Sequence, residues 1–404
     1  MKVVLAKIGA HQTIQFAVEE LTRCLKRMDE KLRVEKRTYQ DYEEALEGVL
    51  WVGLNNKVEE SEDDEILIDI CCGSGVITGS NERAVLIAAY RFLYELGCRW
   101  LYPGPTGEML PSRVLCPETL NVHIQEKASY RHRSVCIEGT NDYENIANII
   151  DWLPKVGMCG YYFQFMVPQC FFQRKYFGKQ AAGVDPGSNL SRDDVHHICL
   201  NIEEEIKKRS LVYHTIGHGW TCEPFGIDGC SWKPKEDKVS PEIKQFFAKI
   251  NGKRELFGGI PLNTNLCYSN PIARDKMTTA VVEYCREHPY VNYLHFWLAD
   301  MDNNQCECDE CQKMRPSDYY VIMLNELDEK LTAAKINTKV VFLIYYDVLW
   351  SPKQQRIHNP DRFVLMFAPA TRSYSKSYAD IDVSQAIELP PYERNKVIRP
   401  TRVE

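Results

Sequence analysis

The sequence predicts an α/β protein: a small N-terminal α/β sandwich followed by a (β/α)8-type TIM barrel that is incomplete at its C-terminus. Short strands alternate with two amphipathic helices over residues 1–125, and longer strand–helix units follow from about residue 130. Parallel strands linked by helices over such a length are typical of a barrel. Six barrel strands can be found where eight are needed. We therefore expect domains at 1–125 and 126–404, the second of them truncated.

The N-terminal segment opens with a predicted strand at 2–8. Apolar residues at helical spacing then form one stripe, which predicts a helix; they are Ile14, Val18, Leu21 and Leu25. The remaining elements expected here are strands at 49–54, 65–70 and 75–79, and a second helix that Asn81 caps and Gly97 ends.

The second segment has longer apolar runs, each of which predicts a buried barrel strand. These runs are 132–138, 158–166, 211–218, 292–300, 339–346 and 362–368. Among the intervening stretches, 273–287 and 317–334 predict helices, because Pro289 follows the first and Pro316 precedes the second.

Composition and charge exclude several classes of partner. The chain has a formal net charge of −7 and no run of Lys and Arg, so a nucleic-acid partner is not expected. No stretch approaches the roughly 20 apolar residues of a membrane span, and the N-terminus lacks a signal-length apolar core. Sixteen cysteines without an export signal favour free thiols and a cytoplasmic location. No phosphate-binding glycine pattern indicates a cofactor, and the oligomeric state stays open.

Carboxylates at predicted strand ends are the first candidates for chemistry. Asp300 closes one apolar run, Asp302 follows it, and Glu138 closes an earlier run. A glycosidase needs one acid to protonate the leaving oxygen and a second group to attack or stabilise the positive centre. Neighbouring carboxylates in different surroundings can supply both roles. The alternative is that Asp302, Asn303 and Asn304 only cap a loop.

Other side chains at strand ends have the chemistry of a sugar site. His218 and Trp220 stand beside glycines that permit close approach of a ligand, and Tyr345 follows a later strand. Sugars lay C–H faces on aromatic rings, while groups such as the amide of Asn303 bond to hydroxyls. Core packing is the alternative for each aromatic residue taken alone.

Three cysteines follow the acidic segment at C-x-C-x-x-C spacing, namely Cys306, Cys308 and Cys311. Thiolates in this arrangement are ligands for structural zinc, which requires four of them. A fourth would have to come from a distance, and the candidates are Cys222, Cys230 and Cys285. The alternative is a cysteine-lined turn without metal.

Two groups of motifs resemble known families. The segment GCRWLYP (97–103), after GSNERAVLIAAYRFLYEL, resembles the N-terminal domain of α-glucuronidases and β-hexosaminidases. RHRSVCIEG, GHGW and the segment 300–311 resemble a bacterial family known as domain of unknown function 4838. Some of its members are classed in glycoside hydrolase family 163, whose enzymes are endo-acting β-N-acetylglucosaminidases on complex N-glycans.

The resemblance implies retaining hydrolysis of β-linked GlcNAc-containing glycans, assisted by the 2-acetamido group of the substrate. It implies Asp300 or Asp302 as catalytic carboxylates, and Glu138, His218 and Trp220 as sugar-site residues. Two rival functions are an α-glucuronidase-like hydrolase and a glycan-binding protein on an incomplete barrel. Partners other than an oligosaccharide substrate are not expected.

Overall fold

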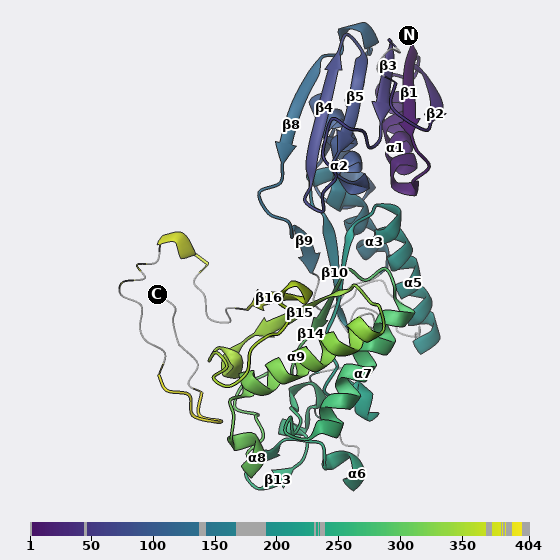
Figure 1. Ribbon diagram of the computed structural model, residues 1–404. Coiled ribbons are helices and arrows are strands. Elements are labelled where there is room, and N and C mark those ends of the chain that lie inside the picture. The colour runs from purple at the N-terminus through teal and green to yellow at the C-terminus, as the bar shows by residue number, and fades with distance from the viewer. Residues whose placement is uncertain are drawn as a thin grey trace. The chain divides into compact units, whose positions relative to one another are not determined.

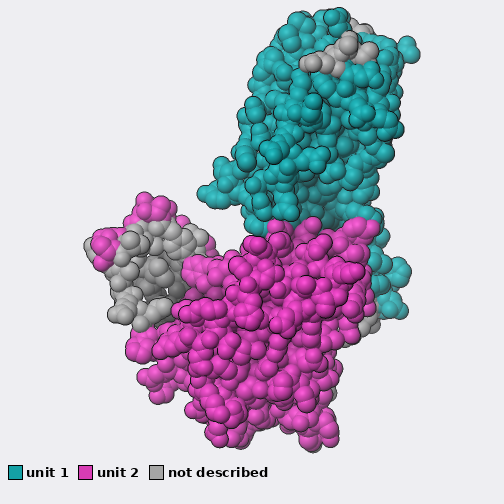
Figure 2. All heavy atoms as spheres, in the orientation of Figure 1, with its two compact units in different colours: residues 1–162, 172–213 teal, residues 163–171, 214–404 magenta. Residues whose placement is uncertain are grey.

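A computed structural model describes residues 2–43, 47–136, 143–166, 191–229, 232, 234, 239–368, 374–380, 382, 384 and 390–397 (Figure 1). Its described residues form two compact units, one from 1–162 with 172–213 and one from 163–171 with 214–404 (Figure 2). The two large sheets divide the chain differently, because the first ends at Lys127 and the second begins at Ser134. The predicted boundary at residue 125 falls within the last strand of the first sheet, and the compact units separate within the second sheet.

The first sheet has six strands in the order β2-β1-β3-β5-β4-β8. β1 pairs in parallel with β2 and β3, and β3 with β5, whereas β4 is antiparallel to both β5 and β8. The strands are β1 (Lys2–Ile8), β2 (Arg33–Tyr39), β3 (Val49–Val52), β4 (Glu65–Cys71), β5 (Ser74–Gly79) and β8 (Val122–Lys127). Sequence analysis located four of these strands and missed β2 and β8, whose side chains are mostly polar and exposed.

Two helices pack on one face of this sheet, α1 (Gln12–Met28) and α2 (Glu82–Glu95). Their apolar stripes join the strands in one buried core. The Asn81 side chain accepts a hydrogen bond from the backbone N–H of Ala84 at 2.9 Å, which caps α2. Gly97, with φ of +95°, ends it, a left-handed conformation that glycine adopts without strain. Both predicted helix boundaries are confirmed.

The second sheet is a curled, parallel half-barrel with the order β16-β15-β14-β11-β10-β9. Its strands are β9 (Ser134–Cys136), β10 (Gly160–Phe165), β11 (Val212–His218), β14 (Tyr293–Phe296), β15 (Lys339–Ile344) and β16 (Phe363–Phe367). The six predicted barrel strands are all present. On the edge strand β16, Leu365 and Phe367 are 53% and 50% exposed, so apolar side chains that a closed barrel would cover lie open.

The longer helices of the second segment are α3 (Tyr143–Trp152), α5 (Arg192–Lys208), α7 (Pro271–Glu287) and α9 (Pro316–Ala333). α7 and α9 pack against each other, and Arg274 of α7 pairs with Glu326 of α9. Smaller elements are β6 (Arg99–Trp100), β7 (Glu108–Met109), β12 (Lys249–Ile250), β13 (Lys253–Arg254), α6 (Pro241–Lys244) and α8 (Asp309–Gln312). Within the described ranges, each helix is too short or too polar to span a membrane.

Candidate active site

Asp300 does not close a strand, contrary to the sequence prediction. β14 ends at Phe296, and the chain then runs irregularly, with the backbone N–H of Asp300 donating to the carbonyl of Leu262 at 2.9 Å. The backbone beyond it turns sharply, since φ is +73° at Met301 and +58° at Asn303. Positive φ is costly for residues other than glycine, and such strain gathers at functional sites. The turn holds Asp300 at the carboxyl end of the half-barrel.

Two donors bond the half-buried carboxylate of Asp300. Its Oδ2 accepts a hydrogen bond of 2.9 Å from the indole Nε1 of Trp232, and its Oδ1 accepts one of 2.8 Å from the backbone N–H of Met301. Tyr345, which directly follows β15, lies close enough to this carboxylate for its negative charge to act on the phenol. Burial and the nearby charge of Asp300 both raise the pKa of Tyr345, so the phenol stays protonated and remains a donor.

His218 lies beside this carboxylate, at the end of β11. Its ring meets the edges of two tryptophans, with centroid distances of 5.2 Å to Trp232 and 5.1 Å to Trp297. Burial lowers the pKa of His218 to about 4, although the negative charge of Asp300 opposes this shift. The imidazole is therefore neutral near pH 7 and offers one donor and one acceptor. The structure thus brings together three of the predicted residues, namely His218, Asp300 and Tyr345.

Trp220, by contrast, is completely buried. Its Nε1 donates a hydrogen bond of 2.8 Å to the backbone carbonyl of His295, and its ring meets the edge of Tyr284. A side chain so enclosed offers no ring face to a ligand, so its place in this structure is in the core. The aromatic residues at His218 are instead Trp232 and Trp297, which sequence analysis did not single out.

Asp302 and Asn303 lie deeper in the loop. Asp302 is 8% exposed. The side-chain amide of Asn303 bonds the backbone of Val397 twice, donating from Nδ2 at 3.0 Å and accepting at Oδ1 at 2.7 Å. Those bonds occupy the amide that was expected to contact sugar hydroxyls, so Asn303 holds the loop in this structure.

Asp347 is a carboxyl group that sequence analysis did not select. It is 3% exposed, and the backbone N–H of Asn303 donates to its Oδ2 at 2.9 Å. Its Oδ1 has no hydrogen-bond partner among the described residues. Burial, with the negative charge of Asp302 nearby, raises the pKa of Asp347 to about 6. A carboxyl group that keeps its proton close to neutral pH can act as a general acid.

Asp347 and Tyr345 both line a small cavity of about 20 Å³, together with Met301 and Gln305. This volume has room for about one water molecule. The position of Asp347 three residues after β15 is the signal that could have identified it, since barrel strands present functional groups at their carboxyl ends.

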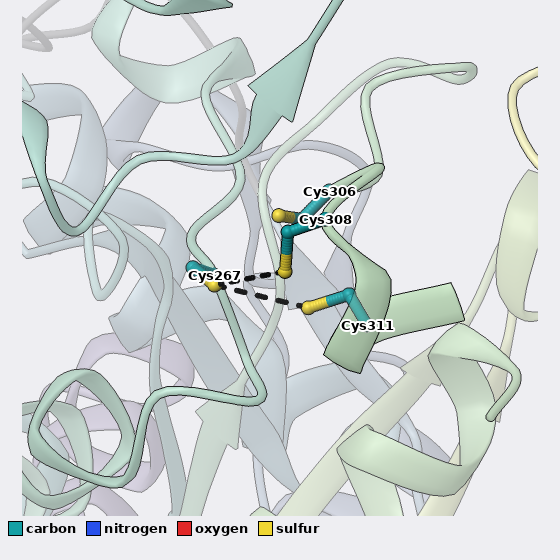
Figure 3. A group of neighbouring side chains, drawn as sticks. All are labelled: Cys267, Cys306, Cys308 and Cys311. Carbon is teal, nitrogen blue, oxygen red and sulfur yellow. Dashed lines mark hydrogen bonds between the residues drawn. The ribbon is translucent and has the colours of Figure 1, made fainter. Parts of the chain in front are cut away.

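Glu138, the remaining predicted sugar-site residue, lies outside the described residues. The predicted cysteines Cys306, Cys308 and Cys311 do lie together, and Cys267 joins them (Figure 3). The expected fourth partner was Cys222, Cys230 or Cys285. Cys230 is outside the described residues, and neither Cys222 nor Cys285 is a member of the cluster.

Comparisons with known proteins show that this chain shares its fold with several solved structures. No protein-family model matches the chain, and no curated protein sequence matches it. Two matching solved structures are family 89 glycoside hydrolases from Clostridium perfringens, one in complex with its substrate GlcNAc-α-1,4-galactose (TM-score 0.52) and one with PUGNAc (TM-score 0.51). Each is 12% identical, over 87% of this chain and 39% of the other.

A chitobiase from Flavobacterium johnsoniae also matches, with a TM-score of 0.47 and 11% identity over 92% of this chain and 51% of the other. The chain therefore spans about half or less of the length of these proteins. The family 89 matches show that this chain has a glycoside hydrolase-like fold, and with the parallel half-barrel they confirm the predicted fold class.

Proposed function

We propose that this chain carries the catalytic residues of a glycoside hydrolase that acts on GlcNAc-containing glycans. The observation that carries this proposal is the group formed by Asp300, Tyr345 and His218 at the carboxyl ends of parallel strands. Barrel enzymes place their catalytic groups at this end. The fold shared with family 89 glycoside hydrolases supports the same class of reaction.

The arrangement suits hydrolysis assisted by the substrate's 2-acetamido group. Asp300 would accept a hydrogen bond from the acetamide N–H, while the hydroxyl of the neighbouring Tyr345 would donate to the acetamide oxygen. Held in this way, the acetamide oxygen attacks the anomeric carbon as the glycosidic bond breaks. Water then opens the cyclic intermediate with retention of configuration. The two side chains thus orient and polarise the nucleophile.

The leaving oxygen needs a proton, and we propose that Asp347 supplies it through a water molecule, because the cavity that this buried carboxyl lines has room for about one. Its pKa of about 6 keeps a proton available close to neutral pH, whereas the hydrogen-bonded carboxylate of Asp300 is suited to accept bonds from the substrate. Two carboxyl groups in different surroundings then fill two roles. Asp302 raises the pKa of Asp347 by its charge and so supports the proton donor.

GlcNAc is the proposed sugar on two grounds. The sequence motifs resemble family 163 endo-β-N-acetylglucosaminidases, and one family 89 structure was solved with GlcNAc-α-1,4-galactose. We propose the β linkage and endo cleavage of complex N-glycans from the first of these resemblances. Trp232, whose ring packs edge-to-face with His218, supplies the aromatic surface that a sugar ring requires.

A second candidate function is glycan binding without hydrolysis. The open edge strand β16, with Leu365 and Phe367 exposed, favours it, because an incomplete barrel can retain a sugar site and lack a catalytic group. The two functions differ in one observable, which is the release of product.

Mass spectrometry of released products tests the proposal directly. The protein is incubated with a complex N-glycan, chitobiose-type substrates and a glucuronoxylan fragment. Cleavage that leaves one GlcNAc on the acceptor supports the endo-hexosaminidase, and release of glucuronic acid would instead support the α-glucuronidase-like rival. If glycans raised the melting temperature and no product appeared, the hydrolase proposal would be wrong and the chain would be a glycan-binding protein.

A further inference from the structure

We propose that Cys267, Cys306, Cys308 and Cys311 bind one zinc ion, a structural site that holds the loop of Asp300 in place. Their four Sγ atoms lie within 4.8 Å of one another (Figure 3). Cys267 comes from the segment before α7, Cys306 and Cys308 from the loop after β14, and Cys311 from the short helix α8. The metal would therefore join two segments that α7 and β14 separate in the chain.

The separation of the sulfur atoms fits a single tetrahedral ion. The Sγ of Cys267 lies 3.6 Å from that of Cys308 and 3.9 Å from that of Cys311. Zinc–sulfur bonds of about 2.3 Å in a tetrahedron place neighbouring sulfurs about 3.8 Å apart. A disulfide would require about 2.05 Å. A polynuclear iron–sulfur cluster would push the thiolates further apart, because iron and sulfide ions lie between them.

Donors and charge around the sulfurs suit thiolates. The backbone N–H of Lys249 donates to the Sγ of Cys306 at 3.2 Å, and the Ser269 hydroxyl lies 3.1 Å from the Sγ of Cys311. The guanidinium of Arg254 donates to the Sγ of Cys267 at 3.7 Å. Four thiolates and a divalent zinc carry a net charge of −2, which these groups partly offset. Such outer contacts orient metal ligands and raise affinity.

The site is also shielded from solvent. Cys267, Cys306 and Cys311 are 5%, 2% and 2% exposed, and Cys308 is partly exposed. All four positions of a tetrahedral ion are filled by protein sulfur, which is the coordination of structural zinc and leaves no open position for catalysis.

The same two segments are joined by buried amides next to Asp300. The Nδ2 of Asn304 donates to the backbone carbonyls of Asp300 and Asn263, each at 2.7 Å, and the Nδ2 of Asn265 donates to the Oδ1 of Asn304 at 2.7 Å. Asn265 precedes Cys267 and Asn304 precedes Cys306. The metal would therefore join the same two segments as this amide network and so hold in place the backbone that carries Asp300. Only this consequence for catalysis rests on the proposed function.

Metal analysis of the full chain tests the site. Protein reconstituted with zinc and freed of excess should retain about one equivalent per chain. Zinc should then protect four of the sixteen cysteine thiols from a thiol reagent under native conditions, and removal by a chelator should expose them. Cobalt substituted for zinc should show the charge-transfer bands of a tetrahedral thiolate site.

A pair of matched variants separates the site from buried cysteines in general. Cys267→Ser should weaken zinc binding more than about a hundredfold. Cys285→Ser changes another buried thiol, 2% exposed in α7, and should leave zinc content unchanged. Wild-type protein that binds no zinc while its thiols are reduced, or that binds iron in preference to zinc, would overturn the proposal. Zinc at one equivalent in a chain without glycosidase activity would support this site and count against the proposed hydrolase.

Discussion

The indole Nε1 of Trp232 donates a hydrogen bond of 2.9 Å to Oδ2 of Asp300, although 68 residues separate the two in the chain. The bond fixes the orientation of the carboxylate together with the backbone N–H of Met301, which donates to Oδ1 at 2.8 Å. A carboxylate oriented in advance loses little free energy to reorganisation when a substrate binds. The candidate site is therefore organised around Asp300.

Asp300→Asn should lower kcat by on the order of 10²–10⁴-fold and leave glycan affinity within a few-fold of wild type. The amide keeps the size of the side chain but loses the negative charge that holds the acetamide. Turnover on the best substrate and ligand-induced thermal shifts measure the two effects. Asp275→Asn is the control, because this aspartate of α7 forms an exposed ion pair with Lys330 of α9. If both variants lost the same turnover, the assignment of Asp300 as a catalytic residue would be wrong.

The pKa of Asp347, raised to about 6, predicts a pH dependence of activity. A general acid must be protonated, so kcat/KM should fall as pH rises through about 6. Asp347→Asn cannot donate the proton and should lose on the order of 10²–10⁴-fold in rate with a natural leaving group. A substrate whose leaving group needs no proton should lose much less. A pH–rate profile flat between pH 5 and 8 would contradict the assignment.

The same shift predicts a change in stability. Since the folded pKa lies above the unfolded value, the native state binds the extra proton between about pH 4 and 6, and stability falls as pH rises through that window. Asp347→Asn removes this fall, and its free energy of unfolding at pH 7.5 should exceed that of wild type by up to about 3 kcal/mol. Urea unfolding of both proteins at several pH values measures the difference, and parallel curves would count against a raised pKa.

His218 should have the opposite effect on stability. Its folded pKa of about 4 lies below the unfolded value, so between about pH 4 and 6.5 the unfolded state binds the extra proton and stability rises with pH. In His218→Gln this rise should disappear. The variant should therefore become more stable relative to wild type as pH falls toward 4. The free energy of unfolding of the two proteins across this range tests the sign, and a variant that gains toward neutral pH instead would contradict it.

Much of the fold was readable from local signals. Apolar runs located all six strands of the half-barrel, and Asn81 and Gly97 located the ends of α2, because burial and capping act within a few residues of the chain. The strands β2 and β8 escaped because their polar, exposed side chains give no apolar signal.

The site was less predictable, since it depends on contacts between distant residues. Cys267 lies 44 residues before Cys311, and an isolated cysteine among polar residues does not indicate which others it meets. The pKa of Asp347 comes from its burial and from Asp302, and a sequence shows neither. The sequence predicted that Trp220 contacts a sugar, but Gly219, with φ of +122°, turns the chain beyond His218. The glycine that was expected to admit a ligand directs the indole into the core instead.

Trp220→Phe should therefore lower stability rather than sugar affinity. The change leaves the carbonyl of His295 without the donor that bonds it at 2.8 Å and opens a cavity in a fully buried place, a loss of about 2–4 kcal/mol. Trp350→Phe is the matched control: its Nε1 also donates to a carbonyl at 2.8 Å, that of Pro390, but water can replace a bond near the surface. Denaturant unfolding should separate the two variants. If Trp220→Phe kept full stability and lost glycan affinity, the ring would belong to the sugar site and the packing role would be wrong.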